Sequence, residues 1–426
     1  MKKYHLYSLI ILISAFSFSQ AQATAIQAYN KIRPLIVQVK SSASSNSEKS
    51  SYGTGFVIDK SGIIMTNYHV VSESIWNPEK LKSYVVFENQ SLEAKILNVD
   101  FVNDLALLKI DHQFPSQIKL AESLPDKGEE IFSLGLPEDL EWTVVKGIYN
   151  GLVKHGPLNS FYMSTPINSG MSGGPIVNSK NELVAVNESI RLASSQISFG
   201  VPLPDVKSLL AEKNSNALTS KQLYYDKLQE QLTLYQEKLT NIIQKSFKKE
   251  KKISKIAIPD LSENFKCWGD SETQQENFYR SETEYCSNEY SIRINDTLEE
   301  GGFDFQFSIT NNYLLNQLSW QNLISSKSTL TLPEVVNSFN SEATLNYTPV
   351  KCIRENITHG NSPILITICY QKILQLKGLF DFYISFYKSL NKKTFISGQV
   401  KIGAFSRSNM KKIINLILDK KFEVSK

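Results

Sequence analysis

A serine flanked by glycines is the segment of the chain that most suggests chemistry: Gly170-Met171-Ser172-Gly173-Gly174-Pro175. The glycines allow the backbone to turn sharply, so that the Ser172 hydroxyl projects while neighbouring N–H groups converge on one point. A nucleophile in acyl transfer needs this arrangement, because the N–H groups stabilise the developing oxyanion. Taken alone, the segment is explained equally well as an ordinary glycine-rich turn between two strands.

Two other polar residues lie beside apolar segments earlier in the chain. His69 follows the apolar segment Ile63–Thr66 and a turn, and Asp104 directly precedes Leu105-Ala106-Leu107-Leu108. A lone histidine at a strand end is usually structural, and an aspartate before a strand is usually a turn residue. The order histidine, aspartate, glycine-flanked serine is much harder to produce by chance. Together the three could perform nucleophilic catalysis assisted by a general base.

Short strands would have to position these residues. Turn residues such as Gly62, Asn103 and Gly128 separate many of the apolar runs, and about a dozen such strands favour an all-β barrel or sandwich. A short helix is predicted near Thr24–Lys31, and the serine-rich Ser41–Ser51 is interpreted as a mobile surface loop. The predicted strands are Ile36–Val39, Thr54–Ile58, Ile63–Thr66, Tyr84–Phe87, Ala94–Val99, Ala106–Ile110, Glu130–Leu134, Val144–Ile148, Phe161–Ser164, Ile176–Val177, Leu183–Asn187 and Ile197–Val201.

This series of segments resembles the trypsin-like serine peptidases, specifically the bacterial exported branch related to the HtrA/Deg proteases. The resemblance extends from about Thr24 to Ala211. It implies two six-stranded β-barrels with the site in the cleft between them. The segments that carry it are Gly53–Ile58, Ile64–Val71, Asn103–Lys109, Thr143–Ile148, Ile167–Pro175 and Phe199–Pro202.

The resemblance also implies a role for each site residue. Ser172 would be the nucleophile and His69 the general base and later the general acid, while Asp104 would hold the imidazole tautomer. The backbone N–H groups of Gly170 and Ser172 would form the oxyanion hole. His69 and Asp104 would come from the first barrel and Ser172 from the second. The implied activity is that of a serine endopeptidase acting on protein or peptide substrates through an acyl-enzyme, without a cofactor. The alternative is an inactive protease-fold scaffold that binds through its C-terminal domain.

The resemblance says less about substrate specificity and about assembly than about the catalytic residues. Pro166 stands where a trypsin-type pocket carries an aspartate, and Ile167, Phe199 and Val201 are candidate pocket walls, which together favour a small apolar P1 residue. Met171 replaces the asparagine usual in HtrA proteases, so the loop geometry could differ. No PDZ domain is recognisable after the protease region. The peptide sensing and cage-like assemblies of that family are therefore not carried over, and the oligomeric state stays open.

The second half of the chain changes in composition. From about Thr219 to Lys252 there is no Gly or Pro, and apolar residues recur every three or four positions, which predicts one long amphipathic helix. We interpret it as a linker helix docked on a neighbouring domain rather than an oligomeric coiled coil. Beyond Pro259 the pattern predicts an α+β domain without a chemical motif. Its predicted strands are Tyr290–Ile294, Phe303–Ile309, Ile364–Tyr370, Phe380–Phe386 and Thr394–Ile402, and its predicted helices are Tyr313–Ser325 and Asn409–Lys421.

Four cysteines lie in this last region, and their even number in an exported chain predicts two disulfides. Of the three possible connectivities we favour sequential pairing, Cys267–Cys286 and Cys352–Cys369, because it closes the shorter loops. Zinc is the competing interpretation, but no CxxC spacing or neighbouring histidine supports it. No metal site is therefore expected.

The N-terminus has the pattern of a secretory signal peptide cleaved after Ala23: Lys2 and Lys3, the apolar Leu6–Phe18, then Ala21-Gln22-Ala23. An uncleaved anchor is the lesser alternative, because the apolar run is too short to span a bilayer. We expect a protein exported to the bacterial periplasm or secreted, without stable membrane insertion. A net charge of only +4 argues against a dedicated nucleic-acid binder. The expected organisation is signal peptide 1–23, protease domain 24–212, helical linker 213–258 and cysteine-containing domain 259–426.

Overall fold

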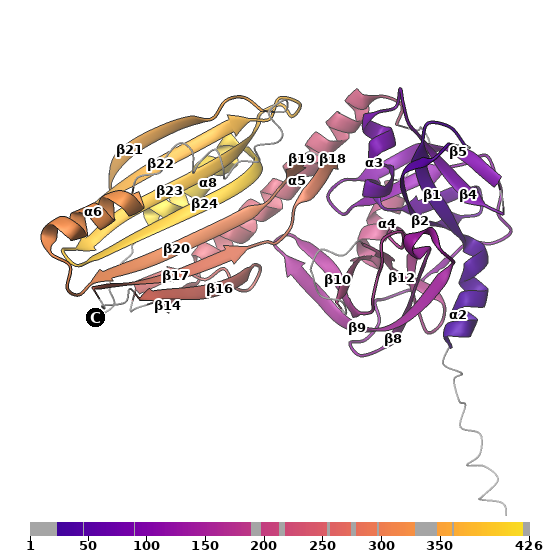
Figure 1. The fold of residues 1–426 in the computed structure, drawn as a ribbon, viewed down its shortest axis with the longest axis horizontal. Helices are drawn as coiled ribbons and strands as arrows, with labels where there is room; N and C mark the ends of the chain where they lie inside the picture. The colour runs from indigo at the N-terminus through magenta and orange to yellow at the C-terminus, as the bar shows by residue number, and fades with distance from the viewer. Residues whose placement is uncertain are drawn as a thin grey trace, which may run out of the picture.

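The computed structural model describes residues 24–45, 47–88, 90–188, 197–212, 218–253, 256–273, 278–295, 298–328, 347–359 and 362–420. The predicted signal peptide lies outside the described residues. The chain forms two lobes, with two β-barrels in the N-terminal lobe and a long antiparallel sheet in the C-terminal lobe (Figure 1). Helix α5 (Lys221–Phe247) runs from one lobe to the other.

The first barrel is a closed sheet with the strand order β1-β2-β3-β6-β5-β4. Its interior is apolar because inward-facing residues such as Val37, Val39 and Val57 are fully buried. Helix α2 (Ala25–Ile32) precedes the barrel and begins with a capping box at Thr24, and a short turn of 3-10 helix, Arg33–Leu35, leads into β1. The strands are β1 (Ile36–Ser42), β2 (Lys49–Asp59), β3 (Ile63–Thr66), β4 (Lys82–Phe87), β5 (Gln90–Asp100) and β6 (Leu105–Lys109).

The second barrel has the order β11-β8-β9-β10-β13-β12, and pairing of β11 with β12 closes it. Strand β7 (Lys119–Leu120) adds a short parallel pairing to β12, and helix α4 (Leu203–Ala211) follows the last strand. The other strands are β8 (Glu130–Gly135), β9 (Thr143–His155), β10 (Leu158–Ser164), β11 (Pro175–Asn178), β12 (Glu182–Asn187) and β13 (Ser198–Pro202). The predicted pair of six-stranded barrels is confirmed, and each strand predicted for this lobe overlaps an observed one.

The predicted loop Ser41–Ser51 is wrong at both of its ends. Strand β1 continues to Ser42, β2 begins at Lys49, and Ser41 pairs with Ser51 across the two strands. The hydroxyls of Ser41 and Ser51 both donate to the carbonyl of Val70, at 3.3 and 2.9 Å. Serines can enter this sheet because the helix that follows β3 supplies an acceptor for their hydroxyls.

The C-terminal lobe is built on a seven-stranded antiparallel sheet in the order β16-β17-β20-β24-β23-β22-β21. Helices α5 and α8 (Arg407–Asp419) pack together and against strand β24, while α6 (Gln317–Ser328) packs on β23 and β24. Four of the five predicted strands and both predicted helices overlap elements of this arrangement, and three further strands, β16, β17 and β21, were not predicted. The seven strands are β16 (Lys266–Thr273), β17 (Tyr279–Ser287), β20 (Phe303–Asn312), β21 (Lys351–His359), β22 (Ser362–Lys372), β23 (Leu379–Asn391) and β24 (Thr394–Ser406).

Two small hairpins complete the lobe. The fifth predicted strand overlaps β18 (Ile292–Asn295), which pairs with β19 (Leu298–Glu300) and projects from the sheet toward the barrels (Figure 1). The other hairpin consists of β14 (Glu250–Ile253) and β15 (Ile256–Pro259). Helix α5 therefore ends at Phe247, and the predicted continuation of the helix to Lys252 is wrong. Lys251 instead forms an ion pair with Glu284 of β17, with 2.5 Å between Nζ and Oε2.

Helix α5 is docked, as its apolar seam predicted. Leu228, Leu232 and Leu239 belong to one buried cluster that also contains residues of the first barrel, such as Val99, and of the C-terminal sheet, such as Phe305. This cluster joins the two lobes through a continuous apolar core. Among the described residues, no helix is long and apolar enough to cross a membrane.

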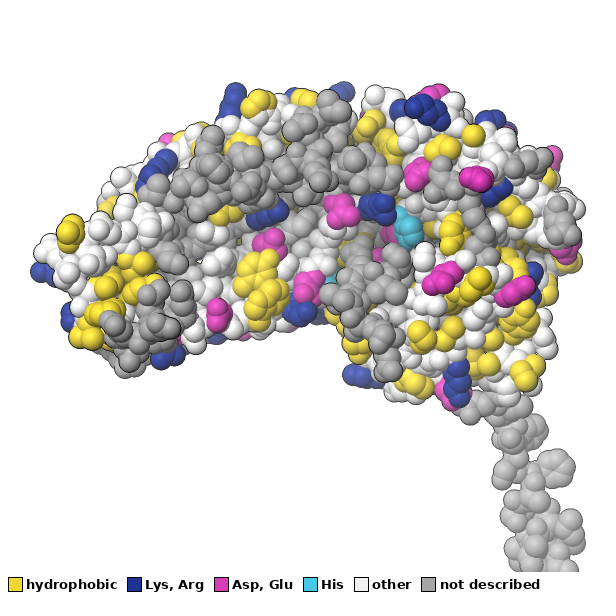
Figure 2. Space-filling model, viewed as in Figure 1, with side chains coloured by type: hydrophobic (Ala, Val, Ile, Leu, Met, Phe, Trp, Pro, Cys, Tyr) yellow, Lys and Arg dark blue, Asp and Glu magenta, His cyan; other side chains and the backbone are white. Residues whose placement is uncertain are grey.

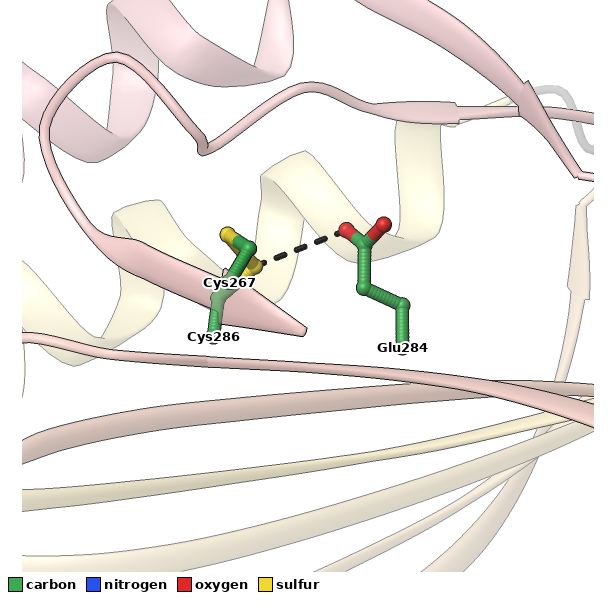
Figure 3. Close-up of side chains that lie close together, drawn as sticks. All are labelled: Cys267, Glu284 and Cys286. Atoms are coloured by element: carbon green, nitrogen blue, oxygen red, sulfur yellow. Dashed lines mark hydrogen bonds between the residues drawn. A yellow bond between two sulfur atoms is a disulfide. The ribbon is translucent and has the colours of Figure 1, made fainter. Parts of the chain in front are cut away.

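Both predicted disulfides are confirmed. Cys267 and Cys286 face each other across β16 and β17, and Cys352 and Cys369 do so across β21 and β22. Glu284 approaches the first disulfide, with Oε1 3.4 Å from Sγ of Cys286 (Figure 3). Both sulfur atoms are consumed by the bond between them, so this group offers no thiolate to a metal ion.

Candidate active site

His69 and Asp104 form the closest polar contact among the predicted site residues. Nδ1 of the His69 ring lies 2.6 Å from Oδ2 of Asp104, and the backbone N–H of His69 donates to Oδ1 of the same carboxylate at 2.9 Å. The carboxylate therefore fixes both the ring and the backbone of the histidine. An N–H at Nδ1 leaves Nε2 with a free lone pair, which is the form of imidazole that accepts a proton.

Two local structures bring this pair together. His69 lies in the first turn of α3 (Tyr68–Trp76), directly after β3, and Asp104 lies in the turn between β5 and β6. Asp104 has a positive φ of +54°, an uncommon conformation for a residue other than glycine. Its carbonyl accepts from the N–H of Tyr68 at 3.1 Å and from Nδ2 of Asn67 at 2.8 Å. The strained turn is thus fixed by the residues that begin the histidine helix.

The surroundings of His69 affect its pKa in opposing directions. Burial is the largest influence and lowers the pKa of His69, but the charge and the hydrogen bond of Asp104 together outweigh burial. A positive charge on Arg293 lowers the pKa further, and a negative charge on Glu188 raises it. The net result is a pKa raised above the ordinary imidazole value. The side chain keeps 18% of its surface exposed, which leaves the ring accessible from the cleft.

Ser172 lies in the loop between β10 and β11 of the second barrel and is 4% exposed. Its carbonyl accepts from the N–H of Thr54, on β2 of the first barrel, at 2.8 Å. The hydroxyl of Thr54 donates to the carbonyl of Gly170 at 2.7 Å and accepts from the N–H of Leu136 at 3.0 Å. Thr54 therefore joins the serine loop to both barrels.

Gly53 shows how closely the serine loop approaches the histidine helix. A Cβ atom on Gly53 would lie 2.6 Å from Cγ2 of Val70 and 2.9 Å from the carbonyl oxygen of Ser172. Only glycine leaves room for this approach. Because Val70 directly follows His69, the backbone of Ser172 lies close to the helix that carries His69.

Among the described residues, the loop that holds Ser172 has two backbone N–H groups that its hydrogen bonds do not use. Gly170 has a φ of +90° and lies in a tight turn in which the N–H of Met171 donates to the carbonyl of Asn168 at 3.1 Å. The N–H groups of Gly173 and Gly174 also donate within the protein, at 3.0 Å each. Within the described ranges, the N–H groups of Gly170 and Ser172 donate to no acceptor. These are the two groups expected to bind an oxyanion.

Asn187 is buried at the base of this loop and satisfies several of its polar groups. Its backbone exchanges hydrogen bonds with Gly173 and Gly174, and its Nδ2 donates to the carbonyls of Leu134 at 3.1 Å and Met171 at 3.2 Å. Its Oδ1 accepts from the hydroxyl of Ser133 at 2.8 Å. No sequence pattern indicates this role, because Asn187 ends an apolar strand as many other polar residues do.

The four predicted pocket residues lie in different environments. Pro166 is exposed, whereas Ile167 and Val201 are buried in the core of the second barrel. Phe199 packs against Tyr162 with 5.8 Å between ring centroids and is 8% exposed. The hydroxyl of Ser198 donates to the carbonyl of Thr165 at 2.7 Å, so the two segments that carry these residues lie side by side.

A cavity of about 310 Å³ lies next to His69 and Asp104, and both lobes line it. Figure 2 shows acidic and basic side chains beside a histidine at the junction of the lobes. The barrels contribute Phe101 and Glu188. The C-terminal lobe contributes Glu289, Tyr290, Ser291, Arg293 and Glu299, none of which the sequence marked as site residues.

Comparisons with known proteins agree with this architecture. Residues 53–186 match the trypsin-like peptidase domain family. A probable periplasmic serine endoprotease, DegP-like, from Pseudomonas fluorescens is 33% identical over 164 residues, which cover 37% of this chain and 33% of that protein. The serine protease HTRA1B of Danio rerio is 34% identical over 179 residues, covering 40% and 36% of the two chains.

Solved structures also match slightly less than half of the chain. The active form of the Rv3671c protease from M. tuberculosis matches with a TM-score of 0.40 and 21% identity, covering 46% of this chain and 87% of that one. A serine endoprotease from Yersinia pestis matches with a TM-score of 0.39 and 27% identity, covering 45% and 66%. The chain spans only about a third of the length of the curated relatives that it matches. Residues 53–186 of the N-terminal lobe thus match a trypsin-like peptidase domain, and the chain has sequence relatives among the DegP-like and HtrA serine proteases.

Proposed function

We propose that the chain is a serine endopeptidase that hydrolyses peptide bonds of protein substrates. The observation that carries this proposal is the 2.6 Å contact between His69 and Asp104, made beside a loop that holds Ser172 and two N–H groups without acceptors in the described part of the chain. A base, a residue that orients it and an oxyanion site around one hydroxyl are the parts that acyl transfer requires.

In the first half of the reaction, Oγ of Ser172 attacks the carbonyl carbon of the scissile bond while Nε2 of His69 takes the hydroxyl proton. The carbonyl oxygen becomes an oxyanion bound by the N–H groups of Gly170 and Ser172. The negative charge of Asp104 stabilises the imidazolium that forms. The imidazolium then gives its proton to the leaving amine, the C–N bond breaks, and an acyl-enzyme remains on Ser172.

The second half repeats these steps with water as the nucleophile. His69 takes a proton from water, the resulting hydroxide attacks the ester carbonyl, and the same N–H groups bind the second oxyanion. The proton on His69 returns to Oγ of Ser172 as the carboxylic acid leaves. We assign the P1 site to the region of Pro166, Ile167, Phe199 and Val201, and its apolar character favours a small apolar P1 side chain.

The site of action is proposed from the same relatives. The DegP-like relatives are periplasmic by name, and residues 1–23 have the pattern of a signal peptide, so we propose export followed by cleavage after Ala23. The exported protein would then comprise the protease domain 24–212, the helical linker 213–258 and the domain 259–426. Its partners would be protein substrates rather than nucleic acids or lipids.

The test compares the wild-type chain with Ser172→Ala. We expect the wild type to degrade unfolded casein and to be labelled by a fluorophosphonate, and we expect Ser172→Ala to do neither. Loss of one triad member should lower turnover by several orders of magnitude. A folded wild-type protein that gives neither signal would favour the inactive scaffold instead.

A further inference from the structure

The C-terminal lobe reaches the candidate active site through the strand β18. Arg293 on this strand lines the same cavity as His69 and Asp104. Its side chain is exposed, so the guanidinium lies in the cavity region rather than in the core of either lobe. The nearest sequence neighbour of Arg293 in the peptidase domain is more than 80 residues away along the chain, so only docking of the lobes brings it here.

Three hydrogen bonds fix β18 and Tyr290, two residues before it, to the structures that hold His69 and Asp104. The carbonyl of Ile294 accepts from Nε1 of Trp76 at 2.5 Å and from the hydroxyl of Tyr68, the residue directly before His69. The hydroxyl of Tyr290 donates to the carbonyl of Val102, two residues before Asp104, at 2.6 Å. All of these side chains are buried, so the strand has a defined position relative to the histidine and the aspartate.

Helix α5 strengthens the same attachment. Oε1 of Gln231 accepts from the N–H of Phe101 at 2.8 Å, and Nε2 of Gln231 donates to the carbonyl of Val99 at 3.0 Å. Phe101 itself packs edge-on against the ring of Tyr68 with 4.7 Å between centroids. The turn that carries Asp104 is therefore held from outside the peptidase domain as well as from within it.

The cavity is lined by charged side chains of both signs. Glu289 is paired with Lys266 at 2.8 Å, and Glu299 accepts from the hydroxyl of Ser291 at 2.7 Å. Arg293 and Glu188 are the two groups of this cavity, besides Asp104, whose charges act on His69. They act in opposite directions, and Arg293 disfavours the imidazolium.

We propose that Arg293 is a positioning residue of the peptidase site: the C-terminal lobe places its guanidinium in the cavity beside His69, where its positive charge opposes a second positive charge on the imidazole. The C-terminal lobe thereby completes the site instead of only being tethered to it. This inference rests on the proposed function, because this opposition matters for catalysis only if His69 acts as the base. Because the Arg293 charge disfavours the imidazolium, His69 can accept a proton at a lower pH than it could without Arg293.

The experiment follows the His69 imidazole by NMR titration, with the His69→Asn spectrum as the assignment, and measures kcat/KM against pH on the same proteins. Arg293→Gln should move the midpoint of His69 to higher pH, because a charge that disfavours the imidazolium is removed. Arg293→Lys should keep the wild-type midpoint. Glu188→Gln should move the midpoint to lower pH. Arg280→Gln is the matched control, since Arg280 is exposed, pairs with Glu282 at 3.0 Å and does not line the cavity.

The inference fails if Arg293→Gln leaves the midpoint unchanged or if Arg280→Gln moves it as far. Arg293→Met supplies a second neutral variant should Arg293→Gln not fold. Fluorophosphonate labelling of the same samples separates this inference from the proposed function. Fluorophosphonate labelling without a shift of the His69 midpoint would contradict the role of Arg293 but support the peptidase. A shift of the midpoint without labelling would contradict the peptidase but support the effect of Arg293 on His69.

Discussion

Nδ1 of His69 lies 2.6 Å from Oδ2 of Asp104, and the other oxygen of that carboxylate accepts from the backbone N–H of His69 at 2.9 Å. The Asp104 carboxylate thus holds both the His69 ring and the first turn of α3, which carries that ring. This double contact explains why Asp104 occupies a turn with a positive φ, since the conformation directs its carboxylate and its carbonyl at the same short segment.

Replacing Asp104 by asparagine should nearly abolish activity while leaving the fold intact. The amide would present either an N–H group or a weaker acceptor to Nδ1, so the ring would no longer be held in the tautomer that leaves Nε2 free. We expect kcat/KM to fall by about 10³–10⁴-fold. Asp111→Asn, an exposed substitution in the same barrel, should keep wild-type activity. A loss below tenfold in Asp104→Asn would contradict the assigned role.

The pH dependence follows from the raised pKa of His69. Burial lowers that pKa, but Asp104 more than compensates, so His69 stays protonated to a higher pH than an ordinary imidazole. Only the neutral form can accept the proton of Ser172, so kcat/KM should rise with pH along a limb centred above 6.5. A profile of kcat/KM in low-salt buffers measures this limb. A midpoint at or below 6.5 would show that Asp104 does not outweigh burial in setting the pKa of His69.

Asn187 should be essential for the serine loop although it does not touch substrate. Removing its amide in Asn187→Ala takes a donor from the carbonyls of Leu134 and Met171 and the acceptor from the hydroxyl of Ser133, although Met171 keeps the N–H of Gly174 as a donor. We expect a loss of about 1–3 kcal/mol in the free energy of unfolding for each group left unsatisfied. Chemical denaturation monitored by tryptophan fluorescence measures it.

The shape-conserving Asn187→Asp should also destabilise the protein, because a carboxylate would face two carbonyl oxygens. Asn159→Ala, on the exposed side of β10, is the matched control and should be close to neutral. Equal stability of Asn187→Ala and wild type would show that the loop does not depend on this amide.

Tyr290→Phe should weaken the attachment of the C-terminal lobe to the turn that carries Asp104. The substitution removes only the hydroxyl that donates to the carbonyl of Val102, leaving that acceptor buried. We expect a loss of stability of about 1–2 kcal/mol and a several-fold lower kcat, with a smaller change in KM. Tyr313→Phe, in which the ring is 55% exposed, should change neither quantity. An unchanged kcat would show that the turn is held sufficiently by the barrel alone.

The sequence predicted the barrels because their strands are short apolar or alternating runs bounded by turn residues. Ile63–Thr66 was predicted with the boundaries that the structure has. Helix α3 was not predicted beyond the turn near His69, because Val70, Val71 and Ile75 are β-branched and favour strands. The helix forms because most of its residues are buried between the first barrel, α5 and β18.

The histidine, the aspartate and the serine could be found from sequence because each lies in a short segment with its own pattern. Arg293, Tyr290 and Glu188 have no such pattern. The positions of Arg293 and Tyr290 at the cavity depend on how the C-terminal lobe docks, through a core shared by α5, the first barrel and the sheet. Docking arises from many apolar contacts between distant residues, which no local spacing records.

The nucleophile itself is the most direct test. Intact-protein mass spectrometry after treatment with a fluorophosphonate, followed by peptide mapping, should find one adduct per chain, on Ser172. The adduct should be absent from Ser172→Ala and strongly reduced in His69→Ala, since the hydroxyl then lacks its base. Labelling of a different residue, or equal labelling of Ser172→Ala, would contradict the account.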